Sequence, residues 1–129
     1  MKMNKAVYDS RFFVELFYST SETFHKKILT QKFNKERFTS AVVIHEIYGH
    51  SIKREGRETA KLKVTLIKKD FKVISVDEQI AQLSAEFRHK YNLSMGDSMV
   101  AATASAIKAV CVTDDPHFKQ ISEIETSWI

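Results

Sequence analysis

Apolar residues gather along the chain in short continuous runs and in longer stretches with helical spacing. Continuous runs of a few branched or aromatic residues, bounded by polar ones, are typical of buried strands. The run that ends at Asp9 and the run around Cys111 are the clearest examples. Together with shorter candidates, they predict strands at residues 5–8, 38–40, 71–76, 109–113 and 124–129.

Between these runs, apolar residues recur three and four positions apart, as on one face of a helix. The expected helices carry residues 12–17, 24–33, 42–52, 58–69, 80–87 and 101–106, with a short helical piece at Phe118. Candidate N-caps are Ser21 or Thr23, Thr39 or Ser40, and Asp77. Strands that alternate with helices imply right-handed crossovers. We therefore expect an α/β fold, a three-layer α/β/α sandwich around a central, mostly parallel sheet of four to five strands.

The composition predicts a single domain spanning residues 1–129. Of the 129 residues, 43% are hydrophobic and 28% are charged, with 3 Gly and 1 Pro, which excludes a disordered or collagen-like chain. Cys111 is the only cysteine, so an internal disulfide and a cysteine-rich zinc site are excluded. No apolar run approaches the roughly 20 residues of a membrane span, and we expect a cytoplasmic protein. The net charge of +4 gives weak support to a polyanionic partner.

Acidic residues follow two of the predicted strands and begin one helix. Asp9 ends the first strand, and Asp114 and Asp115 follow the strand around Cys111. Asp97 lies in the first turn of the alanine-rich helix. In an open parallel sheet, ligands bind outside the carboxyl ends of the strands, where helix N-termini also lie. We therefore expect these acids to converge on one edge of the sheet.

Glu46 needs a separate argument, because it lies inside a predicted helix. At about 100° per residue it falls between Val42 and Val43 and near Ile47, within the apolar stripe. We expect its carboxylate to point toward the core, where an unpaired charge is unfavourable. A lysine or His50 one turn on is one candidate partner, and a bound cation is another.

A divalent metal ion would satisfy several of these carboxylates at once. Crowded carboxylates repel one another, which raises their pKa values unless a cation intervenes. Mg²⁺ prefers such oxygen ligands, and one or two metal ions can activate a water and stabilise charge on a scissile phosphate. The pattern therefore favours phosphodiester hydrolysis. The Thr113 hydroxyl is placed to orient one of the carboxylates.

Each acid also has a purely structural interpretation. Asp9 can cap the first helix, and Asp97 can form a capping box with Ser94. Asp115 can be an ordinary turn residue before Pro116. If each acid served only its own structural role, their meeting at one edge would be a coincidence. A shared site is the more expected explanation.

Other side chains carry weaker signals. The scattered histidines lack the spacing of a zinc protease and are more typical of surface or satisfied core positions: His45, His50, His89 and His117. A row of basic residues could contact phosphates but more often marks a solvated helix face: Lys53, Arg54, Arg57, Lys61 and Lys63.

The motifs resemble those of PIN-domain proteins of the VapC type. The matching pieces are Val7-Tyr8-Asp9-Ser10, Glu46 in the third helix, Leu93-Ser94-Met95-Gly96-Asp97-Ser98, and Val112-Thr113-Asp114-Asp115-Pro116-His117-Phe118. They span nearly the whole chain in order. The Gly-Asp-Ser and Thr-x-Asp-x-x-Phe pieces are the most specific.

The resemblance implies a PIN-like fold and a Mg²⁺- or Mn²⁺-dependent endoribonuclease that hydrolyses RNA with a metal-activated water. The resemblance also implies that such proteins commonly form homodimers. It implies that many relatives are toxins held inactive by an antitoxin protein whose C-terminal segment lies in the acidic groove. Matched residue by residue, the family's acidic quartet, which binds metal and catalyses, corresponds to Asp9, Glu46, Asp97 and Asp115. Thr113 matches the hydroxyl of the last motif. Asp114 stands where the family often has Asn, so both adjacent acids stay candidates for facing the metal.

Two other functions fit parts of the pattern. A protein that keeps the fold without the chemistry would bind RNA or another protein without cleaving RNA. A phosphatase with Asp9 as phosphoryl acceptor would place a second Asp two residues on, where this chain has Arg11.

Overall fold

Five parallel strands form one sheet at the centre of the protein. The computed structural model describes residues 4–31 and 35–129, and Phe33, expected in the second helix, lies outside them. The strands are β1 (Lys5–Tyr8), β2 (Glu36–Ser40), β3 (Lys72–Ile74), β4 (Val110–Val112) and β5 (Thr126–Ser127). Their order is β3-β2-β1-β4-β5, and every neighbouring pair is parallel. The predicted fold class is confirmed.

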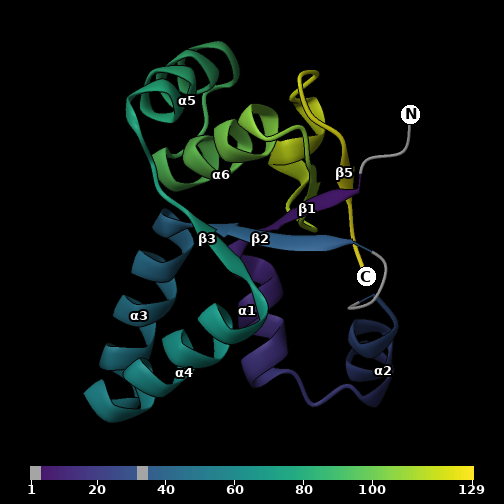
Figure 1. Ribbon diagram of the computed structural model, residues 1–129, viewed down its shortest axis with the longest axis vertical. Helices are drawn as coiled ribbons and strands as arrows, with labels where there is room; N and C mark the ends of the chain where they lie inside the picture. The colour runs from purple at the N-terminus through teal and green to yellow at the C-terminus, as the bar shows by residue number, and fades with distance from the viewer. Residues whose placement is uncertain (1–3, 32–34) are drawn as a thin grey trace.

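Helices cover both faces of this sheet. They are α1 (Ser10–Tyr18), α2 (Glu22–Gln31), α3 (Ala41–Glu55), α4 (Arg57–Asp70), α5 (Glu78–Tyr91), α6 (Met95–Ala106) and the 3₁₀ helix η1 (Pro116–Gln120). Figure 1 shows α5 and α6 on one side of the sheet and α1, α3 and α4 on the other. Within the described ranges, no helix is both long and apolar enough to cross a membrane.

The edge strands are shorter than the sequence predicts. β3 covers three residues of the run 71–76, and β5 covers two residues near the C-terminus. Each pairs with a single neighbour, β2 or β4, so its ladder has hydrogen bonds on one side only. Apolar character alone does not show where such one-sided pairing stops.

Side-chain hydroxyls and carboxylates define where the helices begin. The Ser40 Oγ accepts a hydrogen bond from the Val42 N–H at 3.2 Å and caps α3. Thr39, the alternative cap, instead donates its hydroxyl to the Tyr8 carbonyl oxygen at 2.8 Å. Asp77 caps α5 as predicted, accepting from the Ile80 N–H at 2.9 Å.

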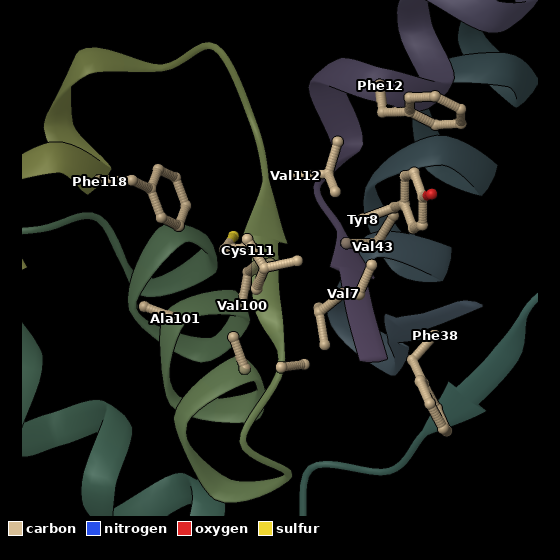
Figure 2. Close-up of a cluster of buried hydrophobic side chains, with 14 of the residues drawn as sticks. Val7, Tyr8, Phe12, Phe38, Val43, Val100, Ala101, Cys111, Val112 and Phe118 are labelled. Atoms are coloured by element: carbon tan, nitrogen blue, oxygen red, sulfur yellow. The ribbon is translucent and has the colours of Figure 1, made fainter. Parts of the chain in front are cut away.

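The core lies on both faces of β1 and β4. Figure 2 shows Cys111 with Val100 and Phe118 on the α6 side, and Tyr8 with Phe12 on the α1 side. The rings of Tyr8 and Phe12 meet edge to face, with centroids 4.6 Å apart. Because both faces are covered, the central strands are continuous apolar runs, and polar residues resume only beyond their carboxyl ends.

Those carboxyl ends meet at one edge of the sheet. Tyr8 is in register with Val112, so Asp9 and Thr113 follow the two strands side by side. The start of α6 reaches the same edge, since a Cβ added to Gly96 would lie 3.0 Å from the Glu46 Oε2 of α3. Segments distant in sequence therefore place their acids together.

Candidate functional site

Asp9 lies at the base of this acidic edge and is almost completely buried. Its side chain is 1% exposed, directly after the central strand β1. The Oδ1 accepts a hydrogen bond from the Ser10 N–H at 2.7 Å, and the Oδ2 accepts one from the Thr113 hydroxyl at 2.8 Å. Asp9 thus caps α1 and also joins the ends of β1 and β4. The capping interpretation and the site interpretation apply to the same residue.

Asp97 and Asp115 face each other across the edge, with His117 beside them. One ligand atom from each of these three residues lies within 4.8 Å of the other two. The Asp115 Oδ1 is 2.8 Å from the His117 Nδ1 and accepts from the His117 N–H at 3.0 Å. The Asp97 N–H donates to the Ser94 Oγ at 3.2 Å, so Ser94 caps α6. The Asp97 carboxylate lies at the acidic edge, close to Asp115 and His117.

Glu46 does not point into the core, and that expectation is wrong. The buried face of α3 consists of Val43, Ile47 and Ser51, and Glu46 lies on its exposed flank. Its carboxylate rests against Gly96, where the missing Cβ leaves room for it. Helical spacing places Glu46 next to the apolar stripe of α3. In the structure α3 packs on the sheet through Val43, Ile47 and Ser51, so Glu46 lies beside this buried face and toward the acidic edge.

The two adjacent acids have different environments. The Asp114 carboxylate pairs with Arg11, whose Nε lies 2.5 Å from Oδ1 and whose Nη2 lies 3.3 Å from Oδ2. Asp115 instead lies next to Asp97. A metal ion at the acidic edge would thus meet Asp115, whereas Asp114 is already matched to a cation.

Loss of hydration and mutual repulsion raise the pKa values of these acids. Loss of hydration, together with the negative charges of Asp97 and Asp115, raises the pKa of Asp9 to about 6, although the Thr113 and Ser10 hydrogen bonds oppose it. Loss of hydration and the charges of Asp9 and Asp97 raise the pKa of Glu46 to about 7. Burial and the Asp115 charge raise the pKa of Asp97.

The donor set fits a hard divalent cation. In the described part of the chain, no Lys or Arg forms an ion pair with Asp9, Glu46 or Asp97. Carboxylate oxygens are the ligands that Mg²⁺ and Mn²⁺ prefer. A bound cation would favour the charged carboxylates and so lower the pKa values that desolvation and mutual repulsion raise.

Part of the predicted basic helix face is engaged elsewhere. Lys63 is buried and binds the Glu55 carboxylate and the Tyr18 hydroxyl. The Arg54 guanidinium lies 4.3 Å from the centre of the Tyr18 ring. These two cations connect α1, α3 and α4, so they do not form a free phosphate-binding row.

Three residues at the edge carry weak signals in the sequence but make specific contacts in the structure. His117, one of the scattered histidines, contacts Asp115. Arg11 pairs with Asp114 across neighbouring strand ends, and the parallel register of β1 and β4 was a usable signal for that pair. Gly96 marks a close approach, which an otherwise unfavourable glycine in a helix can indicate.

The PIN domain family matches the sequence over residues 6–124. The chain belongs to the PIN domain family, and the resemblance carried by its motifs is confirmed. No curated protein matches the chain.

Solved structures of VapBC proteins and of a VapC toxin share the fold along almost the whole chain. VapBC2 from Rickettsia felis, bound to a promoter DNA fragment, is 16% identical, with 97% of this chain and 98% of that chain covered and a TM-score of 0.83. DNA-bound VapBC from Salmonella typhimurium is 18% identical, with 98% of both chains covered and a TM-score of 0.81. VapC20 from Mycobacterium tuberculosis, described as a sarcin-ricin loop cleaving toxin, is 17% identical, with 93% and 97% covered and a TM-score of 0.75.

The pKa of Asp9 predicts that the metal-free protein loses stability as the pH rises. The folded-state pKa of about 6 exceeds the ordinary 3.8, so the folded state binds more protons between these pH values. The free energy of unfolding should fall by up to about 3 kcal/mol from pH 4 to pH 7 through this group. The free energy of unfolding of Asp9→Asn should not fall through this group, so the variant should become more stable relative to the wild type as the pH rises from 4 to 7. Urea unfolding in EDTA measures this stability difference between variant and wild type. At pH 7, replacing EDTA with Mg²⁺ should make the difference smaller. A pH-independent difference would contradict the assignment.

Gly96→Ala should weaken metal binding without destabilising the fold. The added Cβ would lie 3.0 Å from the Glu46 Oε2 and displace that carboxylate. We expect Mn²⁺ affinity, measured by calorimetry, to fall about tenfold, while the alanine favours the helix. Gly49→Ala is the matched control, because a Cβ there meets nothing within 4 Å. Equal Mn²⁺ affinity in the two variants would show that Glu46 takes no part.

Proposed function

We propose that this protein is a Mg²⁺- or Mn²⁺-dependent endoribonuclease and the toxin of a toxin–antitoxin pair. The observation that carries the proposal is the convergence of Asp9, Glu46, Asp97 and Asp115 on one edge of a PIN-domain sheet, with pKa values raised at the first three. Membership of the PIN family supports nuclease chemistry. The name of VapC20, a sarcin-ricin loop cleaving toxin, supports RNA as the substrate class.

In this proposal, the chain's own residues bind and orient the reacting groups. Asp9 and Asp97 bind the cation most directly, and Glu46 and Asp115 complete its surroundings. Thr113 and the Ser10 N–H hold the two Asp9 oxygens in fixed positions. When bound, the cation lowers the pKa of a nearby water and stabilises charge on the phosphate. The water oxygen would form a bond to phosphorus and the water would give up a proton, while the P–O bond to the departing ribose oxygen breaks and that oxygen takes up a proton.

Asp9→Asn should abolish RNA cleavage while the fold persists. The change removes one negative charge at the base of the site, with nearly the same shape. We expect a loss of at least about 100-fold in rate, measured by incubating total RNA with Mg²⁺ or Mn²⁺, and complete loss for the wild type in EDTA. Glu86→Gln, at an exposed position of α5, is the charge-matched control and should cleave normally.

The outcomes separate the nuclease from its main rival. RNA binding without cleavage at any Mg²⁺ or Mn²⁺ concentration would favour a binding module that keeps only the fold. Undiminished cleavage by Asp9→Asn would refute the site.

An apolar groove offers a surface for the antitoxin. It encloses about 420 Å³ between α1, α2 and α4. Leu29 and Leu66 line it and are 60% and 47% exposed, unusually open for leucines. Several structural relatives were solved as toxin–antitoxin complexes. We assign this groove to an apolar segment of the antitoxin. Homodimer formation and a cytoplasmic location stay predictions.

Leu66→Glu should block antitoxin binding and leave RNA cleavage intact. A carboxylate in the groove would oppose an apolar segment, and we expect at least about a tenfold loss of affinity. Leu62→Glu is the matched control, since Leu62 is 58% exposed on the same helix but does not line the groove. Growth of cells that co-express toxin and antitoxin, with size-exclusion chromatography of the complex, gives the readout. Equal growth and equal complex formation for the two variants would show that the antitoxin does not bind in the groove.

A further inference from the structure

The Arg11 side chain lies beside the acidic edge. Arg11 lies in the first turn of α1, two residues after Asp9, and its side chain is 55% exposed. Its Nε and Nη2 face the two oxygens of Asp114 at 2.5 Å and 3.3 Å, in a side-by-side arrangement. Within the described ranges no other hydrogen bond of Arg11 is present. The Nη1 end of the guanidinium is thus available for another acceptor.

The Arg11 guanidinium also interacts electrostatically with the other acids of the site. The charges of Asp115 and Asp9 raise the pKa of Arg11, after the larger effect of its hydrogen bond to Asp114. The Arg11 charge in turn lowers the pKa of Asp97. Arg11 therefore lies within electrostatic range of three acids at the candidate site, although it pairs with none of them.

An RNA strand meets an electrostatic problem at such a site. Its phosphates are anionic, and the carboxylates of Asp9, Glu46, Asp97 and Asp115 repel them wherever the metal charge does not compensate. A fixed cation at the rim relieves this repulsion. Arginine suits the task because its planar guanidinium binds a carboxylate with one edge and keeps further N–H donors for a phosphate.

We propose that Arg11, held in place by Asp114, binds a phosphate of the RNA strand at the rim of the acidic site, an inference that rests on the proposed nuclease function. Asp114 is a positioning residue in this arrangement. It fixes the direction of the guanidinium and keeps Arg11 from collapsing onto Asp115. This role also gives a reason for an acid at position 114, where the resemblance leads one to expect Asn.

A purely structural role makes different predictions. An exposed ion pair contributes little to stability and is screened by salt. If the Arg11–Asp114 pair only fastened α1 to the loop after β4, its removal would lower the melting temperature slightly. It would leave RNA affinity and its salt dependence unchanged.

Binding and kinetics of matched variants test the proposal. In an Asp9→Asn background, Arg11→Ala should weaken binding of an end-labelled RNA hairpin about tenfold in fluorescence anisotropy. It should also reduce the slope of log affinity against log salt by about 1. In the otherwise wild-type chain, Arg11→Ala should raise KM more than it lowers kcat. Arg11→Lys, which keeps the charge but loses the fork, and Asp114→Asn should give intermediate effects.

Lys69→Ala is the charge-matched control. Lys69 is exposed in the last turn of α4, just before β3 begins, and so lies near the opposite edge of the sheet. RNA affinity and salt slope for Arg11→Ala equal to those of Lys69→Ala would overturn the proposal, and so would an absence of RNA binding by the parent protein.

The outcomes also separate this inference from the proposed function. If the wild type fails to cleave RNA but Arg11→Ala still weakens binding with the reduced salt slope, phosphate binding stands and the nuclease function falls. If the wild type cleaves and Arg11→Ala binds and cleaves like Lys69→Ala, only the role of Arg11 falls.

Discussion

A buried carboxylate after the central strand organises this protein. Asp9 is 1% exposed, yet both of its oxygens accept hydrogen bonds, from the Ser10 N–H and the Thr113 hydroxyl. These bonds begin α1 and hold the ends of β1 and β4 together. Each oxygen has a hydrogen-bond donor, but within the described ranges no Lys or Arg pairs with the negative charge. The charges of Asp97 and Asp115 make ionisation of Asp9 less favourable still, a condition that a bound cation would relieve.

The fold tolerates this unfavourable edge because its core is extensive on both sides of the sheet. Val7 and Phe13 are completely buried, and aromatic rings meet edge to face along the α1 side. The apolar layers between the sheet and the helices thus supply the stability, while the acids lie beyond the carboxyl ends of the strands.

The two adjacent acids that follow β4 have different partners and lie in different environments. Asp114 and Asp115 are adjacent in sequence, but the first binds Arg11 and the second faces Asp97 and His117. The turn into η1, capped by the Asp115 side chain, points the two carboxylates to different places. The edge therefore holds an Arg11–Asp114 ion pair next to a carboxylate cluster, and the two have different partners.

Local patterns in the sequence were enough to predict the five strand positions, the cap at Asp77 and the acids after β1 and β4, since hydrophobic spacing and capping depend on residues close in the chain. The direction of Glu46, the different partners of Asp114 and Asp115, and the place of His117 were decided by tertiary structure. Periodicity defines a helix face to within about a residue, whereas contacts such as Glu46 against Gly96 depend on how distant elements pack.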